Sequence, residues 1–91
     1  MKFSEALEHA KRGAKISREG WNGKGMFVSL VNGDSIKGAI HKAHGDCDED
    51  AYDVLDFLMM FTAQSDLVPW VASQSDLLAE DWCVLQGVSY K

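Results

Sequence analysis

The five consecutive apolar residues Phe57–Phe61 constrain the fold of this chain more than any other segment. Apolar residues between 52 and 62 also keep helical spacing, so periodicity alone leaves both a helix and a strand open. The polar triplet Gln64-Ser65-Asp66 favours a hairpin turn, with Leu67–Ala72 as its second arm. We therefore expect a strand from about Asp56 and a central hairpin that carries Trp70.

Another strand is expected at Met26–Val31, which is rich in aromatic and β-branched residues. Asn32-Gly33 or Gly33-Asp34 is typical of the tight turn that follows such a strand. Ser35–Ile40 is then a candidate partner strand, although Gly38 weakens it because glycine has no side chain to pack.

The N-terminal segment has the pattern of a short amphipathic helix. Its apolar residues from Phe3 to Ala10 recur at helical spacing, which places them on one face. Ser4 is a candidate N-cap, and Gly13 is the expected stop after the last turn.

Four further segments complete the expected fold. They are a short extended piece at Ala14–Arg18, an exposed loop at His41–Asp53, one or two helical turns at Asp76–Asp81, and a final strand at Trp82–Leu85. The pattern as a whole predicts an α+β fold, in which the N-terminal helix packs on an antiparallel sheet of about four to five strands. Residues 1–91 are expected to form this single small domain.

The 91 residues leave room for one hydrophobic core, and the 46% apolar share argues against disorder. Charge is distributed unevenly, since residues 1–45 carry 8 basic and 4 acidic side chains while residues 46–91 carry 1 basic and 10 acidic ones. Such a chain offers no uniformly basic face to DNA or RNA. A domain this small often gains stability by burying surface in an oligomer.

The sequence shows no secretory signal, and its longest apolar run is far too short to span a membrane. Cys47 and Cys83 are too far apart for a CxxC metal pair and form no disulfide framework. We therefore expect a soluble cytoplasmic protein that does not act at a membrane.

A glycine-rich loop around Trp21 is the first candidate binding element. Glycines at positions 20, 23 and 25 indicate a sharply bent backbone whose free amides can face an anion. Asn22 can contact a base or ribose edge, while Lys24 and the preceding Arg18 can meet a phosphate. A tight turn whose tryptophan covers the core explains these residues about equally well, because no tabulated phosphate-loop motif fits.

The segment after Trp70 is the second candidate binding element. An indole can stack on a base, which is worth about 1–3 kcal/mol, and Ser73 and Gln74 would add hydroxyl and amide groups. The residues alone slightly favour another interpretation, in which Ser73 or Ser75 caps the following turn and Trp70 belongs to the core. Trp82, inside a strand-like run, is expected in the core.

No metal site, cofactor or catalytic group is predicted. The histidine- and acid-rich run at 41–48 lacks the residue order of a calcium loop, so a solvated acidic loop explains it better. No Ser/His/Asp or Cys/His grouping supports a nucleophile. Glu80-Asp81 is a possible carboxylate pair, but two surface charges on a short helix are the expected arrangement.

Two parts of the chain resemble a known family. They are Phe3–Leu7 with Lys11 and Gly13, leading through Arg18–Lys24 to Met26-Phe27, and the closing Leu67–Trp82. Both are similar to the second type of Thoeris anti-defence protein, a family of small phage proteins. The resemblance covers roughly the first and last thirds of the chain. Residues 32–66 depart most, and their acidic run could repel a pyrophosphate.

The resemblance implies a non-catalytic function in the cytoplasm of an infected bacterial host cell. Members of the family bind a cyclic ADP-ribose isomer made by the host's TIR-domain sensor and hold it without cleaving it, so the effector is not activated. Some members also bind cyclic dinucleotides. They assemble as homotetramers with ligand pockets between subunits.

By motif, the two loop tryptophans would stack on the adenine, and Asn22, Ser73 and Gln74 would supply polar contacts. The two basic residues are assigned to phosphate on their chemistry. The predicted ligand-binding residues are therefore Arg18, Trp21, Asn22, Lys24, Trp70, Ser73 and Gln74.

Two other classes of function stay open. One is an enzyme that hydrolyses the same nucleotide, which would return a ligand of altered mass. The other is a structural or regulatory phage protein with no small ligand. In that case Trp21→Ala and Trp70→Ala would damage folding rather than binding alone.

Overall fold

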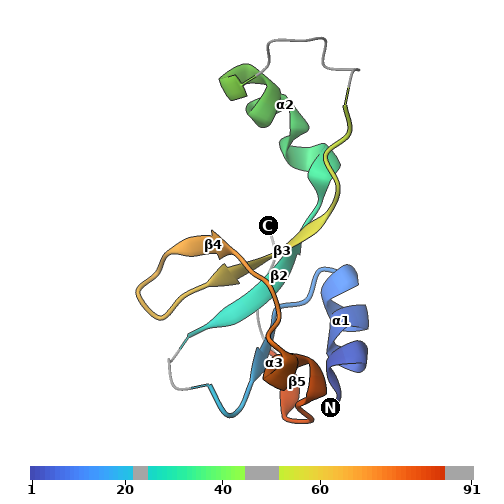
Figure 1. Ribbon diagram of the computed structural model, residues 1–91, viewed down its shortest axis with the longest axis vertical. Helices are drawn as coiled ribbons and strands as arrows, with labels where there is room; N and C mark the ends of the chain where they lie inside the picture. The colour runs from blue at the N-terminus through green and yellow to red at the C-terminus, as the bar shows by residue number, and fades with distance from the viewer. Residues whose placement is uncertain (22–24, 45–51, 86–91) are drawn as a thin grey trace.

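A computed structural model describes residues 1–21, 25–44 and 52–85 of the chain (Figure 1). The described helices are α1 (Phe3–Lys11), α2 (Gly33–His44) and α3 (Gln74–Leu78). The described strands are β1 (Ile16–Arg18), β2 (Phe27–Val31), β3 (Phe57–Phe61), β4 (Leu67–Pro69) and β5 (Trp82–Val84). The strands form one sheet in the order β4-β3-β2-β1-β5, and every neighbouring pair is antiparallel. The predicted α+β fold, with an N-terminal helix and a five-stranded antiparallel sheet, is confirmed.

Helix α1 ends as predicted but begins earlier than the sequence suggested. Gly13 adopts a left-handed φ of 97° and donates its N–H to the Ala10 carbonyl at 3.0 Å, while the next N–H reaches the His9 carbonyl. These two bonds satisfy carbonyls that the helix leaves unpaired. At the other end Ser4 is not the N-cap. Lys2 occupies that position, because its backbone N–H donates to Glu5 Oε1 at 2.9 Å.

The strand register divides the sheet into two apolar faces. Val28 pairs with Met60 and Phe27 pairs with Phe61, and paired residues in an antiparallel sheet share a face. The face containing Val28 packs under α1 and holds the core, whose buried residues are Ala6, Ala10, Ile16, Val28 and Trp82. We call the opposite face the outer face; its apolar residues on β2 and β3 are Phe27, Val31, Phe57, Met59 and Phe61.

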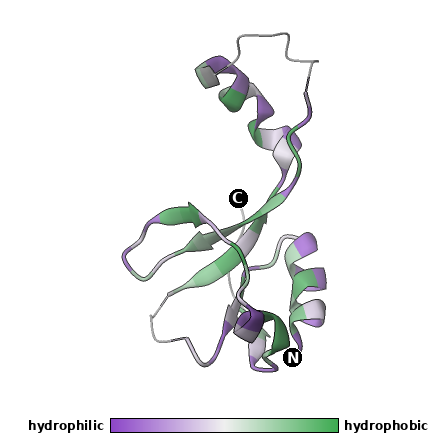
Figure 2. Ribbon diagram, in the orientation of Figure 1, coloured by the Kyte–Doolittle hydropathy of each residue, from purple (hydrophilic) through white to green (hydrophobic). Residues whose placement is uncertain are grey.

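The outer face remains partly exposed in the described chain. All five of its apolar β2 and β3 residues are of intermediate burial, and none packs against the buried core. Phe27 and Phe61 stack with ring centroids 5.1 Å apart and planes 11° apart. Strands β2, β3 and β4 are coloured largely as hydrophobic in Figure 2, which agrees with apolar side chains on both faces.

The predicted hairpin is present, but it lies at the edge of the sheet and not at its centre. Strands β3 and β4 pair as expected, and β3 continues to β2 on its other side. Pro69 suits an edge strand because proline has no N–H to donate to a further strand. Trp70 follows directly and donates its backbone N–H to the Leu58 carbonyl at 3.0 Å.

The prediction of a strand at Ser35–Ile40 is wrong, because this segment lies within helix α2. Asn32 explains why a helix forms here and not a strand. Its side-chain oxygen accepts the backbone N–H of Asp34 at 2.9 Å, which is the hydrogen bond of a helix N-cap. The Ser35 N–H also donates to the Asn32 carbonyl. The Asn32-Gly33 pair that favours a hairpin turn in the sequence therefore starts a helix.

Helix α2 projects from the main body (Figure 1), and the molecule measures 43 × 25 × 24 Å. The helix packs on the returning chain at Tyr52, whose ring lies 5.2 Å from Lys37 Nζ and whose hydroxyl lies 3.0 Å from His41 Nδ1. The Gly33 N–H donates to Asp56 Oδ1 at 2.9 Å. The expected loop at His41–Asp53 is thus partly helical, and its residues 45–51 lie outside the described chain.

Among the residues that the structure describes, no helix is long and apolar enough to cross a membrane.

Candidate functional site

Four aromatic side chains meet on the core face of the sheet, and we call them the aromatic cluster: Phe3, Trp21, Trp70 and Trp82. They come from the start of α1, the loop after β1, the end of β4 and the start of β5. The ring centroids of the contacting pairs lie 5.1 to 6.4 Å apart. Edge contacts of this kind are favourable beyond the area that they bury. The fold therefore brings together the two loops that the sequence singled out.

Trp82 is the buried centre of the cluster, as expected from its strand-like surroundings. It is 1% exposed, and its ring centroid lies 5.1 Å from that of Phe3 and 5.3 Å from that of Trp21. The indole N–H donates to the Asp76 carbonyl at 2.8 Å, so the buried ring has no unsatisfied donor.

Trp21 and Trp70 are half-buried, as is Phe3, so both indoles are partly open to a ligand. Their ring centroids are 6.4 Å apart and their planes meet at 70°. Because the rings are nearly perpendicular, a flat base can lie against one of them at a time in this arrangement. The stacking of either ring on adenine stays a prediction.

Arg18 forms ion pairs with two carboxylates beside the cluster. Its Nε lies 2.8 Å from Asp81 Oδ1, and its Nη1 lies 2.9 Å from Asp76 Oδ1. The three side chains are 20%, 32% and 14% exposed, in the order Arg18, Asp81, Asp76. We call these three residues the Arg18 network. The phosphate contact of Arg18 stays a prediction, and its guanidinium already has two anionic partners.

The electrostatics of the network favour its charged form. For Asp76, partial burial acts to raise the pKa, but hydrogen bonds from Arg18 and Ser73 and an interaction with Trp21 outweigh it, so the pKa is lowered. The Asp81 pKa is lowered chiefly by the Arg18 hydrogen bond. The Arg18 pKa is raised by Asp81 and then by Asp76.

Ser73 and Gln74 lie at the start of α3, and both are exposed. Ser73 is the N-cap, with its hydroxyl accepting the Asp76 N–H at 3.1 Å and its own N–H donating to Asp76 Oδ2 at 3.2 Å. The capping interpretation of Ser73 is therefore confirmed. Its hydroxyl also lies 3.0 Å from the Ser75 hydroxyl. Ligand contacts of Ser73 and Gln74 stay predictions.

The predicted contacts of Asn22 and Lys24 fall on residues outside the described chain. The same holds for Cys47 and the neighbouring acidic residues that the metal argument considered. Within residues 1–21, 25–44 and 52–85, no three His, Cys, Asp or Glu side chains are grouped to hold a metal ion.

The sequence did not identify Asp76 or Asp81 as members of the site, and it placed Asp81 among surface charges. One feature of the sequence, the position of Arg18 in its strand, did indicate that this residue has an acidic partner. Strand side chains alternate between faces, so Arg18 must share the face of buried Ile16. A cation at the edge of a core face requires a carboxylate partner, and the acidic residues near Trp82 were the natural candidates.

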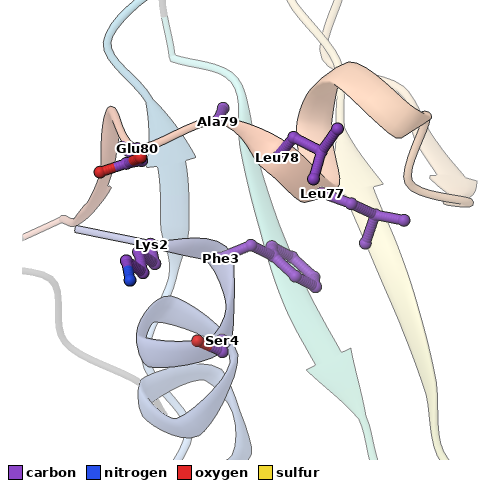
Figure 3. Close-up of a pocket in the computed structure, with 7 residues that line it drawn as sticks. All are labelled: Lys2, Phe3, Ser4, Leu77, Leu78, Ala79 and Glu80. Atoms are coloured by element: carbon purple, nitrogen blue, oxygen red, sulfur yellow. The ribbon is translucent and has the colours of Figure 1, made fainter.

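A shallow cavity of about 330 Å³ lies between the start of α1 and α3 (Figure 3). It is lined by Lys2, Phe3, Ser4, Leu77, Leu78, Ala79 and Glu80. Figure 3 shows the Phe3 ring pointing toward Leu77. The cavity contains none of the seven predicted ligand residues, and Phe3 alone joins it to the aromatic cluster.

These features define a small α+β domain with a tryptophan-lined site beside the Arg18 network. Comparison with known sequences gives the family. Residues 1–85 match the Thoeris anti-defense 2-like domain. The chain is 38% identical over 86 residues to Thoeris anti-defense 2 of Bacillus phage SP01, covering 93% of this chain and 94% of the phage protein. The chain belongs to the Thoeris anti-defense 2 family, and this membership supports a role in phage anti-defence.

Proposed function

We propose that this protein binds a cyclic ADP-ribose-type immune signalling nucleotide in the host cytoplasm and sequesters it without cleaving it. The effector of the host defence would then lack its activator. Membership of the Thoeris anti-defense 2 family supports the anti-defence role. A cyclic dinucleotide is a second ligand that the same kind of site can take.

The aromatic cluster is the observation that carries this proposal. Trp21 and Trp70 are half-buried neighbours, and the polar segment that starts with Ser73 follows Trp70 by three residues in the chain. An indole face with hydroxyl and amide groups next to it suits a purine base, because stacking supplies affinity and hydrogen bonds supply orientation. Ser73, Gln74 and Asn22 are the proposed polar contacts, and Lys24 is the proposed phosphate contact.

Self-association as a homotetramer is part of the proposal, and the outer face supports it. Phe57, Met59 and Phe61 of β3 lie on this face with Phe27 and Val31 of β2, and all five remain half-exposed. Leu67 of β4 continues the same face and is 62% exposed. A contiguous apolar sheet face of this kind is typical of an interface, and a second copy offers a matching surface.

Native mass spectrometry of the protein with cyclic ADP-ribose isomers and cyclic dinucleotides tests the proposal. We expect a tetramer that carries ligand and releases it with unchanged mass on denaturation. Ligand of altered mass would establish an enzyme instead. The absence of any bound nucleotide would leave the family resemblance without this mechanism.

Two variants separate a binding role of the tryptophans from a structural one. We expect Trp21→Ala and Trp70→Ala to weaken nucleotide binding about five- to 150-fold while the tetramer persists, because each removes a stacking surface worth about 1–3 kcal/mol. Exposed Leu78→Ala, at 79% exposure on α3, is the matched control and should bind normally. Loss of the tetramer in both tryptophan variants would favour the structural interpretation.

A further inference from the structure

The Arg18 network joins three segments that are distant in sequence. Arg18 ends β1, Asp76 lies in α3, and Asp81 precedes β5. The two ion pairs span 58 and 63 residues of chain. Both bonds are 2.9 Å or shorter, and the side chains are at most 32% exposed, so the network differs from a flexible surface salt bridge.

Asp81 ties the network to the loop that carries Trp21. Its Oδ2 accepts the Gly20 backbone N–H at 2.9 Å, and its backbone carbonyl accepts the Glu19 N–H at 3.0 Å. A Cβ at position 20 would lie 2.8 Å from the same carboxylate oxygen, so a larger residue there would push the Asp81 carboxylate away. The two residues immediately before Trp21 are thus both held by Asp81.

Asp76 ties the network to the segment that follows Trp70. Its Oδ1 receives Arg18, whereas its Oδ2 accepts the backbone N–H of Ser73 at 3.2 Å and the Ser73 hydroxyl at 2.9 Å. Its backbone carbonyl accepts the Trp82 indole N–H at 2.8 Å. One residue therefore fixes both the start of α3 and the buried Trp82 ring, which contacts the half-buried rings of Trp21 and Trp70.

The same geometry makes Arg18 poorly suited to bind a phosphate. Its guanidinium is flanked by two carboxylates, so the three side chains together carry one net negative charge. The lowered pKa of each carboxylate keeps that charge at neutral pH. A pyrophosphate approaching the network would be repelled, unless the ion pairs were first broken.

We propose that Arg18 is a positioning residue, which acts through Asp76 and Asp81 to hold the Trp21 loop and the Ser73 segment in the arrangement that binds nucleotide. The inference rests on the proposed function and deepens it. It assigns the affinity for the ligand to the geometry of the network and not to the positive charge of Arg18.

Isothermal titration with cyclic ADP-ribose tests this on four variants: Arg18→Gln, Arg18→Lys, Asp81→Asn and the double variant Arg18→Gln/Asp81→Asn. We expect each single variant to weaken binding about 10- to 100-fold. The double variant should bind as tightly as whichever of Arg18→Gln and Asp81→Asn binds more weakly, because both changes disrupt the same ion-pair network. Arg18→Lys should not rescue binding, since an ammonium cannot bond both carboxylates as the planar guanidinium does.

A direct phosphate contact predicts the opposite pattern. Asp81→Asn would then bind as well as or better than the wild type, because a negative charge is removed, and Arg18→Lys would retain most of the affinity. Adenosine, which has no phosphate, separates the two further: the positioning role predicts a similar fold-loss for it, and a phosphate contact predicts none. Either opposite result overturns the inference.

Control measurements keep the outcomes distinct. Arg12→Gln removes an exposed basic side chain at the end of α1 and should leave binding unchanged. Tryptophan fluorescence should show a shifted emission maximum in the network variants, while far-UV circular dichroism confirms that they fold. If the wild type binds no nucleotide, the proposed function fails and the positioning role falls with it. If the wild type binds and Asp81→Asn matches it, the positioning role alone fails.

Discussion

Replacement of Gly33 with alanine should detach the projecting helix α2 from the chain that supports it. Gly33 is buried at the start of the helix, where an added Cβ would overlap the Val54 carbonyl oxygen and lie 2.5 Å from its carbonyl carbon. Ordinary van der Waals contact begins near 3.4 Å, and the overlapping carbonyl oxygen is the nearest atom, so the two backbones must separate by clearly more than about 1 Å. That movement also lengthens the 2.9 Å bond from the Gly33 N–H to Asp56.

The loss of stability expected for Gly33→Ala follows from the steric overlap and the lengthened hydrogen bond. Overpacking costs about 1–3 kcal/mol, and a hydrogen bond to a charged group contributes about 1.5–3 kcal/mol. Because one displacement causes both losses, we expect about 2–4 kcal/mol in total and not their sum. Amide hydrogen exchange in α2 should then accelerate at least about 30-fold, since 1.4 kcal/mol corresponds to a factor of ten. Exchange in the sheet should change far less.

Gly38→Ala is the matched control within the same helix. Nothing lies within 4 Å of a Cβ at this exposed position, so alanine should stabilise α2 by about 0.8–1 kcal/mol through helix propensity alone. Its α2 amides should exchange about fivefold more slowly than those of the wild type. The reasoning is refuted if Gly33→Ala leaves exchange in α2 unchanged, or if the two glycine substitutions act in the same direction.

Three further predictions concern the core, the ion network and the outer face. Trp82→Phe removes a buried indole N–H that the Asp76 carbonyl accepts, so urea unfolding should show that the free energy of unfolding falls by about 2–4 kcal/mol. A fall below about 1 kcal/mol would contradict the buried role of Trp82. The control Leu78→Ala, at an exposed position, should change this free energy by less than about 0.5 kcal/mol. The carboxylates of the Arg18 network have lowered pKa values, so their stabilisation is present above the unfolded aspartate pKa of about 3.9 and is lost as pH falls through the folded pKa values. The melting temperature should therefore fall more steeply below about pH 4 in the wild type than in Arg18→Gln. Parallel curves of melting temperature against pH would argue against the network. Met59→Lys places a charge on the outer face and should reduce the oligomer mass in native mass spectrometry while the fold is retained. The control Leu55→Lys, at an 80% exposed position outside the sheet, should leave the oligomer mass unchanged. An unchanged mass for Met59→Lys would exclude this face as the interface.

Most strands and helix α1 could be predicted because their signals are local. The apolar run Phe57–Phe61 with a polar turn after it specifies a hairpin, and Gly13 after a periodic segment marks the end of a helix. Helix α2 could not be predicted in this way. Asn32-Gly33 serves equally as a hairpin turn and as a helix cap, and only the folded chain shows the Asn32 side chain bonded to Asp34.

The candidate site was predictable in part for the same reason. The sequence alone identified the two tryptophan segments, and the fold places Trp21 and Trp70 in one cluster. The partners of Arg18 lie 58 and 63 residues away, and no local pattern records such pairing. The position of the hairpin at the edge was missed likewise, because the order of strands depends on pairings between distant segments.

The pairing of β1 with β5 has a consequence for the growing chain. Ser17 and Cys83 face each other across 66 residues, and the buried Trp82 enters only with β5. At about 5–20 residues per second, roughly 3 to 13 s separate the synthesis of these two strands. Over that time α1 and β1, joined by β2 to β4 as each is made, have no Trp82 to complete the core. We therefore expect the nascent protein to expose apolar surface to chaperones until β5 is made.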